Sequence, residues 1–128
     1  MSDIIEYVVR VSPDGVKRWY RHNGQYHRED GPAIEYPNGS KEWYLNGKYH
    51  REDGPAIESS DGTKCWYLHG KRHREDGPAI EYGDGGKWWF LNGKQFSESE
   101  WKKEMNKKQT FDGKLIEIDG KRYKLVEI

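Results

Sequence analysis

The chain lacks the features that would place it outside the cytoplasm. Cys65 is its one cysteine, so no disulfide framework can form within the chain. No apolar stretch approaches the length of a membrane span, and the N-terminus does not resemble a signal peptide. We expect a cytoplasmic protein that has no membrane partner and carries Cys65 as a passive thiol.

An excess of charge of one sign is also missing. The 22 basic side chains balance 22 acidic ones, and each section of the chain is close to neutral. Non-specific binding to nucleic acid requires a polybasic surface, and no section provides one. The sequence therefore predicts no DNA partner.

Hydrophobic residues are scarce: they make up 33% of the chain, and the mean hydropathy is −1.20. Disordered chains combine low hydropathy with high net charge and few aromatics. Here the net charge is zero, and six Trp, nine Tyr and three Phe supply large buried areas per residue. We expect one folded domain that is held together by aromatic side chains.

An internal repeat organises the sequence. The string HREDGPAIE occurs without change at residues 27–35, 50–58 and 73–81, a period of 23 residues. A looser copy precedes these three and starts at Asp14-Gly15. A fixed period of this length indicates stacked structural units. We assign residues 1–13 to an N-terminal capping strand, 14–96 to four repeats and 97–128 to a C-terminal cap, all within one domain.

Each repeat predicts about one β-hairpin. Short strand-like segments flank Asn-Gly or Asp-Gly dipeptides, which tolerate the positive φ angles of tight turns, and the prolines mark strand boundaries. Residues 4–11 (IIEYVVRV) predict an opening strand. The fold class we expect is mainly β, an antiparallel meander of about eight to ten strands.

Alternation along the predicted strands assigns their faces. Trp43 and Leu45 should point one way, and Glu42 and Tyr44 the other. Successive Trp residues should lie two strands apart, about 10 Å, as a spaced ladder. We expect Ile34, Ile57 and Ile80 to fill the spaces of this ladder.

The C-terminal segment departs from the repeat. Residues 97–100 (SESE) form a capping box and predict a helix over about 98–108, whose lysines form a solvated face. A final hairpin follows, with its turn at Asp119-Gly120. We expect the helix and the hairpin to cap an exposed end of the array.

The 23-residue unit, with its Trp-Tyr strand, Asn-Gly-Lys turn and returning Gly, resembles the MORN repeat family over about residues 14–96. The HREDGPA string resembles a variant of this repeat found in bacteriophage, giant-virus and bacterial proteins. The resemblance implies an elongated, twisted single sheet that is used for protein contacts. The Tyr-x-Gly-x-Trp order of the usual unit is not kept, so the lipid contacts of some members are not carried over. The short, charged chain with a helical tail also looks like a phage accessory protein.

The repeated His-Arg-Glu-Asp does not predict catalysis or metal binding. Zinc ligands lie within about 2.3 Å of the ion, whereas His27, His50 and His73 should lie about 10 Å apart. Glu29 and Asp30 are adjacent, so they face opposite sides of an extended chain. No nucleophile elbow, P-loop or dinucleotide fingerprint occurs. We expect no enzyme, no catalytic or metal-binding residues and no cofactor.

A structural role accounts for much of the repeated string. Each Asp can accept a hydrogen bond from the backbone two residues on, as an Asx turn. Each Arg can pair with a Glu of the same or next repeat, and each His can pack beside the Trp ladder with one ring nitrogen satisfied.

Two binding functions remain open. The first is contact with another protein through exposed aromatics on the sheet, with a host enzyme or defence system as the partner if the chain is phage-encoded. The alternative is a phosphate-bearing nucleotide or signalling molecule held at His/Arg/aromatic repeat junctions. Self-association through end strands is a third expectation. The protein-contact residues would be Tyr20, Tyr44, Tyr67, Trp88 and Phe90. The nucleotide-contact residues would be His27, Arg28, His50, Arg51, His73 and Arg74.

Overall fold

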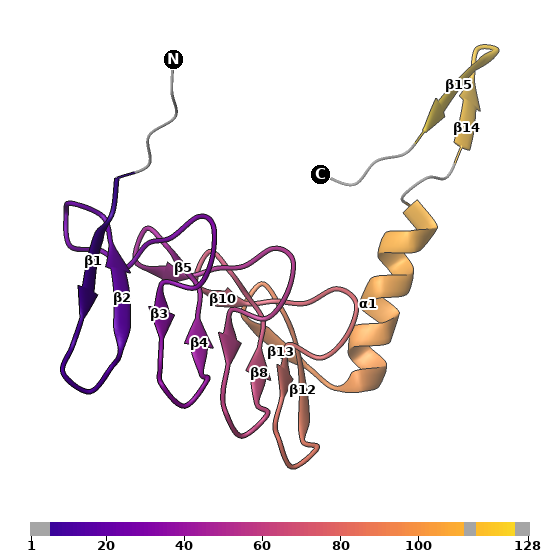
Figure 1. The fold of residues 1–128 in the computed structure, drawn as a ribbon. Helices are drawn as coiled ribbons and strands as arrows, with labels where there is room; N and C mark the ends of the chain where they lie inside the picture. Colours follow the sequence, from indigo (N-terminus) through magenta and orange to yellow (C-terminus); the bar gives the residue numbers. More distant parts are fainter. Residues whose placement is uncertain (1–5, 112–114, 125–128) are drawn as a thin grey trace.

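The computed structural model describes residues 6–111 and 115–124. Its main element is an open antiparallel sheet of nine strands, which confirms the predicted fold class. Figure 1 shows most of these strands side by side in chain order. Residues 4 and 5 of the expected opening strand lie outside the described residues. The strands, in spatial order, are β1 (Val8–Val11), β2 (Lys17–Tyr20), β3 (Ile34–Glu35), β4 (Lys41–Glu42), β7 (Ile57–Glu58), β8 (Lys64–Cys65), β11 (Ile80–Glu81), β12 (Lys87–Leu91) and β13 (Lys94–Phe96).

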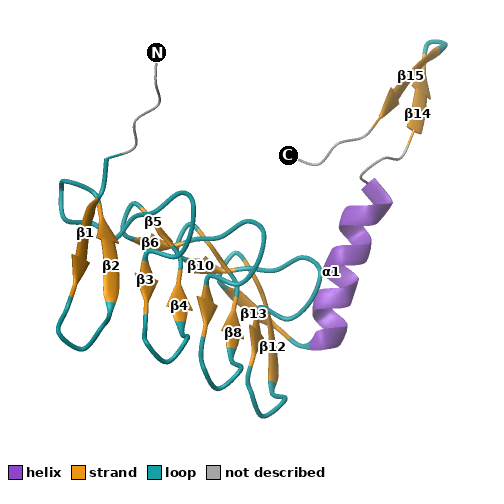
Figure 2. Cartoon of the chain, in the orientation of Figure 1, coloured by secondary structure: helices purple, strands orange, loops and turns teal. Residues whose placement is uncertain are grey.

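Short hairpins leave this sheet between β4 and β7 and between β8 and β11. The first consists of β5 (Tyr44–Leu45) and β6 (Lys48–Tyr49), and the second of β9 (Tyr67–Leu68) and β10 (Lys71–Arg72). They form a second row of strands behind the main sheet (Figure 2). The Gly70 N–H donates to Tyr49 O at 2.8 Å, so consecutive hairpins are joined as well. The two repeats that carry these hairpins therefore contribute to both rows.

The turns of these hairpins follow the Asn-Gly prediction. Asn46 and Gly47 have φ angles of 51° and 79°, both in the left-handed region. His69 takes the place of Asn in the next repeat and keeps the same conformation, with φ 50°. Two consecutive positive φ angles are the signature of the type I′ turn, whose twist matches that of the strands.

The two faces of the sheet differ from the expected arrangement in one respect. Ile34 pairs with Glu42, and Ile57 with both Glu42 and Cys65, so the isoleucines share the Glu42 face. The expectation that isoleucines fill the Trp ladder is therefore wrong. Alanines lie between the tryptophans instead: the Trp43 N–H donates to Ala56 O at 2.7 Å. Ala33, Ala56 and Ala79 are all 0% exposed.

An aromatic column runs across the Glu42 face. Neighbouring ring centroids lie 4.3 to 5.1 Å apart, so side chains of adjacent hairpins stabilise one another. The Arg72 guanidinium continues the column, 6.0 Å from the Tyr67 centroid and 5.3 Å from that of Phe90. This column supplements the few apolar side chains that are fully buried. Its rings belong to Tyr20, Tyr26, Tyr44, Tyr49 and Tyr67.

Helix α1 (Glu98–Phe111) covers the C-terminal end of the array, where it packs against β12 and β13. Its capping box forms as predicted, since Glu100 accepts a hydrogen bond from the Ser97 N–H at 3.0 Å. The predicted last hairpin is also present, as β14 (Leu115–Ile118) and β15 (Lys121–Lys124), beyond the far end of α1 (Figure 1). Within the part of the chain that the structure describes, no helix combines the length and apolar character needed to cross a bilayer.

Candidate functional site

Three loops with the sequence Arg-Glu-Asp-Gly line one side of the array; we call residues 28–31, 51–54 and 74–77 the REDG loops. Arg51 organises the middle one. Its Nε donates to Asp53 Oδ1 at 3.0 Å and its Nη1 to Pro55 O at 3.0 Å. Its guanidinium lies 3.8 Å from the Trp43 ring centroid, a stacked cation–π geometry. The side chain is 21% exposed, so most of this cation faces the protein.

Arg28 and Arg74 repeat this arrangement. Their guanidinium carbons lie 4.0 Å from the Trp19 ring centroid and 3.7 Å from that of Trp66. Each arginine also lies close to a glutamate of its own repeat, as expected: Arg74 Nη1 is 3.1 Å from Glu81 Oε1. The repeated arginines therefore fasten each loop onto the Trp side of the sheet.

The expected Asx turns at Asp30, Asp53 and Asp76 do not form. Such a turn needs the N–H of the residue two positions on, and that residue is a proline, which has none. The Asp oxygen accepts the Arg Nε–H instead, at 2.9 Å in the first loop. Asx hydrogen bonds occur at the β-turns on the opposite side of the repeat, as between the Thr63 N–H and Asp61 Oδ1 at 2.8 Å.

A histidine supports each REDG loop. His50 is buried, and its Nδ1 accepts a hydrogen bond from the His69 N–H at 2.9 Å. His27 and His73 accept the equivalent bonds from Asn46 and Asn92, also at 2.9 Å. An accepting Nδ1 requires the tautomer with the proton on Nε2, which lies 3.6 Å from Glu52 Oε1 in the middle repeat. The prediction of a packed His with one satisfied ring nitrogen is confirmed.

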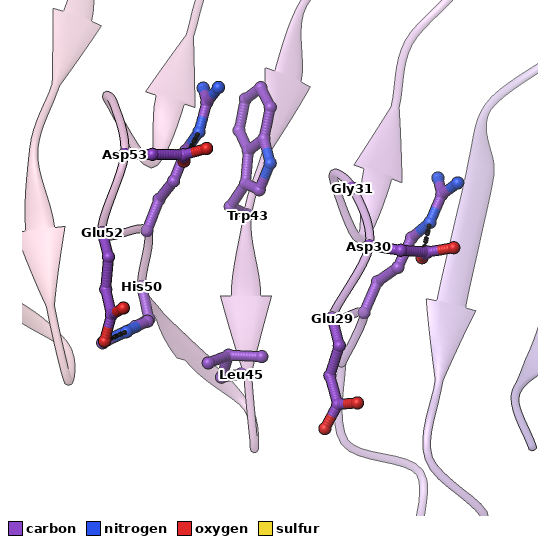
Figure 3. A pocket seen from close by; sticks show the side chains of 10 residues that line it. Glu29, Asp30, Gly31, Trp43, Leu45, His50, Glu52 and Asp53 are labelled. Atoms are coloured by element: carbon purple, nitrogen blue, oxygen red, sulfur yellow. Dashed lines mark hydrogen bonds and ion pairs between the residues drawn. The ribbon is translucent and has the colours of Figure 1, made fainter. Parts of the chain in front are cut away.

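Two neighbouring clefts separate the three REDG loops. The first has a volume of about 600 Å³ and lies between the first and middle loops, with Trp43 and Leu45 on the strand between them (Figure 3). The second has a volume of about 560 Å³ and lies between the middle and last loops, over Trp66 and Leu68. The two clefts share the residues of the middle loop, and we call them together the REDG groove.

Carboxylates dominate the rim of the REDG groove. Each cleft is lined by two arginines and four acidic residues, a formal charge of −2. The acidic side chains reach furthest into solvent: Glu52 is 81% exposed and Asp53 86%. A ligand entering the first cleft would meet Glu29, Asp30, Glu52 and Asp53 before the stacked guanidinium groups.

The sequence reasoning brought His, Arg and aromatic rings together at the repeat junctions, and the structure places them there. It missed the exposed carboxylates and the Trp-Leu floor as binding candidates. The signal was present, because each His-Arg-Glu-Asp contains two acidic residues and one arginine. Among the described residues, no group of three or more His, Cys, Asp or Glu side chains could hold a metal ion.

The expected aromatic contact face is only partly exposed. Phe90 is 8% exposed and belongs to the small core around Ala79 and Ile80, so the expectation of an exposed Phe90 is wrong. Trp88 is 46% exposed and can contact a partner. The remaining three candidates, Tyr20, Tyr44 and Tyr67, are half-buried members of the aromatic column.

Glu42 joins three of the tyrosines beneath that face. Its carboxylate accepts hydrogen bonds from the hydroxyls of Tyr36 at 2.8 Å, Tyr44 at 3.1 Å and Tyr49 at 2.8 Å. Burial and the hydrogen bond to Glu42 raise the pKa of Tyr36 to about 12. Burial also raises the pKa of Tyr44 and of Tyr49. These hydroxyls donate their hydrogen bonds within the protein, to Glu42.

Cys65 lies one repeat period of 23 residues after Glu42 and occupies the same position in the next repeat. Both residues pair with Ile57. Burial raises the pKa of its thiol. A thiol that resists ionisation is a poor nucleophile. This environment agrees with the passive role expected from the sequence.

Comparison with protein families, with curated proteins and with solved structures finds no match to this chain. The resemblance to the MORN repeat therefore stays a prediction.

Proposed function

We propose that this chain is a non-enzymatic module that binds another protein, and that the REDG groove is the contact surface. The observation that carries the proposal is the duplication of one cleft at a regular spacing. A catalytic site needs one distinct constellation of groups, whereas two like clefts side by side suit an extended partner. Repeat arrays commonly bind partners along surfaces of this kind.

The aromatic side chains of the other face are a weaker candidate surface. Tyr44 donates to Glu42 and its ring centroid lies 4.3 Å from that of Tyr49, and Tyr67 accepts a hydrogen bond from Arg72 Nε at 3.2 Å. Replacing them would disturb the scaffold as well as a contact, so loss of binding in such variants would be ambiguous. The REDG groove offers exposed side chains that can be changed with less structural effect.

The alternative ligand is a phosphate-bearing nucleotide in the same clefts. His, Arg and Trp side chains line each cleft and favour that reading, but the formal charge of −2 per cleft repels an anion. Native mass spectrometry of the purified chain with a nucleoside triphosphate tests it directly. A retained nucleotide that is lost on Arg51→Ala would support this alternative, and no binding at millimolar nucleotide would end it.

Site-specific photo-crosslinking tests the proposed surface. A photoreactive residue at position 52 lies on the groove rim, and the same residue at position 98 replaces another exposed glutamate, on α1. We expect position 52 alone to capture a partner, and the purified partner to lose affinity for a groove variant. Equal capture from both positions, or a partner whose affinity is unchanged by groove variants, would contradict the proposal. The identity of that partner would test the predicted role in modulating a host enzyme or defence system.

A further inference from the structure

The spacing of the clefts restricts the conformation of a bound chain. Equivalent points of successive repeats are two strands apart, which corresponds to about 9.5 Å for strands spaced 4.7–4.9 Å. A polyproline II helix has three residues per turn and rises about 3.1 Å per residue, so every third side chain returns to the same side after about 9.3 Å. The side chains of such a segment would enter consecutive clefts in step.

Other regular conformations fit this spacing less well. A β-strand returns a side chain to the same side every two residues, after about 6.6 Å. An α-helix returns a side chain to about the same side after each turn, at about 5.4 Å and then 10.8 Å, and it needs room for a cylinder about 10 Å wide. The polyproline II segment is the thinnest chain whose period matches the array.

The charge of the groove restricts the side chains of that segment. The exposed carboxylates of Glu52 and Asp53 form the rim, while the Arg51 cation lies flat on Trp43. A basic side chain can lay its apolar stem along Trp43 and Leu45 and bring its charged end to the carboxylates. Both parts of an Arg or Lys side chain thus find a complementary surface in each cleft.

We propose that the REDG groove binds an extended basic segment of another protein, in the polyproline II conformation, with Arg or Lys at every third position. This inference rests on the proposed function and specifies its partner. The loops are already held in place by the Arg51 hydrogen bonds and the His50 acceptor, so the groove needs little reorganisation. The polyproline II segment is also largely ordered before binding, which reduces the entropy lost on association.

Two fluorescent peptides of identical composition test the spacing. One is Arg-Pro-Pro repeated three times, and the other carries the same three arginines in one block followed by the six prolines, so that its outermost arginines lie only about 6 Å apart in the polyproline II conformation. Titration with the full-length chain, followed by fluorescence anisotropy, should give at least about tenfold tighter binding of the periodic peptide, because only its arginines can reach both clefts at once. Equal affinity of the two peptides would overturn the inference, since it would mean non-specific charge attraction.

Matched double variants test the location. Glu29→Gln with Glu52→Gln removes two carboxylates from the first cleft while keeping side-chain length and an oxygen acceptor for the neighbouring histidines. Glu98→Gln with Glu104→Gln removes the same charge from α1. Because each exposed ion pair contributes modestly, we expect about tenfold weaker peptide binding for the groove variant and less than about twofold for the α1 variant. Equal loss in both variants would overturn the inference.

Amide chemical shifts of the wild-type chain provide a second measurement that needs no variant. The periodic peptide should shift the amides of residues 28–31, 51–54 and 74–77 and leave the body of α1 unchanged. Shifts confined to other parts of the sheet would overturn the inference.

If photo-crosslinking from position 52 identifies a partner that contacts the groove through an acidic, apolar or helical segment, the proposed function stands and the basic polyproline II inference fails. If the periodic peptide binds the groove but the partner docks elsewhere, the proposed function fails instead.

Discussion

The glycine of each REDG loop provides a sharp test of how the loops are held. Gly77 has no left-handed φ, so conformational freedom does not explain it. Space does: a Cβ built on Gly77 would lie 2.8 Å from Arg74 Cζ, closer than carbon atoms approach in proteins. Gly77→Ala should therefore displace the Arg74 guanidinium from the Trp66 ring and from Asp76.

The expected magnitude follows from two opposing effects. Overpacking a tight site destabilises a protein by about 1–3 kcal/mol. Replacing glycine by alanine where the backbone tolerates it stabilises the protein by about 0.4–1 kcal/mol, because the unfolded chain loses conformational freedom. We expect Gly77→Ala to lower the free energy of unfolding by about 1–2 kcal/mol in the wild type. In an Arg74→Ala background the clash is absent, so the same change should stabilise by about 0.5 kcal/mol.

Urea unfolding of the four proteins, followed by Trp fluorescence and circular dichroism, measures this cycle. The coupling free energy between Gly77 and Arg74 should reach about 1.5–2.5 kcal/mol, within the range for residues in contact. Arg74→Lys is a second background that keeps the charge but lacks the guanidinium carbon, and it should relieve much of the clash. An equal cost of Gly77→Ala in all backgrounds would refute the steric explanation.

Three further predictions concern the scaffold. The free energy of unfolding should fall as the pH rises from 10.0 toward about 12, because the unfolded chain releases the Tyr36 proton before the folded one does. Tyr36→Phe, which also leaves Glu42 with one donor fewer, should reduce this fall in pH-dependent urea unfolding without abolishing it, because the pKa values of Tyr44 and Tyr49 are raised as well. His50→Leu should cost about 1–3 kcal/mol because the His69 N–H loses its acceptor, whereas His50→Asn, which is smaller but keeps an oxygen near Nδ1, should cost less; a Leu variant as stable as the Asn variant would contradict this. Trp101→Phe removes a 3.1 Å hydrogen bond from α1 to the last REDG loop, so amide exchange should accelerate in α1 by a factor corresponding to about 1 kcal/mol and remain unchanged in the sheet.

The local features of this fold could be predicted from the sequence because their signals are local. The Asn-Gly turns, the alternation of Trp43 and Tyr44 between faces, and the capping box at Ser97 each depend on residues a few positions apart. The helix extends a few residues beyond its expected end, to Phe111. Helix ends are set by packing and by capping groups that the sequence marks less clearly.

The packing between strands was harder to predict. Alternation puts Ala33 and Ile34 on opposite faces, but which of them shares the Trp face depends on the register across the Gly-Pro junction. The larger residue was expected to fill the space between the tryptophans, but this fully buried position holds an alanine. The clefts form between the loops of neighbouring repeats, so their shape and net charge depend on how these loops are placed relative to one another. The sequence of one repeat predicts which residues line a cleft, but it does not show that the carboxylates outnumber the arginines there.

The pattern of identity among the repeats supports a binding role for the REDG loops. Exposed turn positions differ from repeat to repeat, as in Asn38 and Asp61, so exposure alone does not require identical residues. The scaffold accounts for the repeated Arg and Asp, which hold each loop, and for the His that accepts a backbone hydrogen bond. It accounts less well for Glu52, which is largely exposed. The closest ion-pair contact of Glu52 joins its Oε1 to His50 Nε2 at 3.6 Å. A glutamate at the same rim position of all three REDG loops is what a ligand with a regular spacing of positive charges would require.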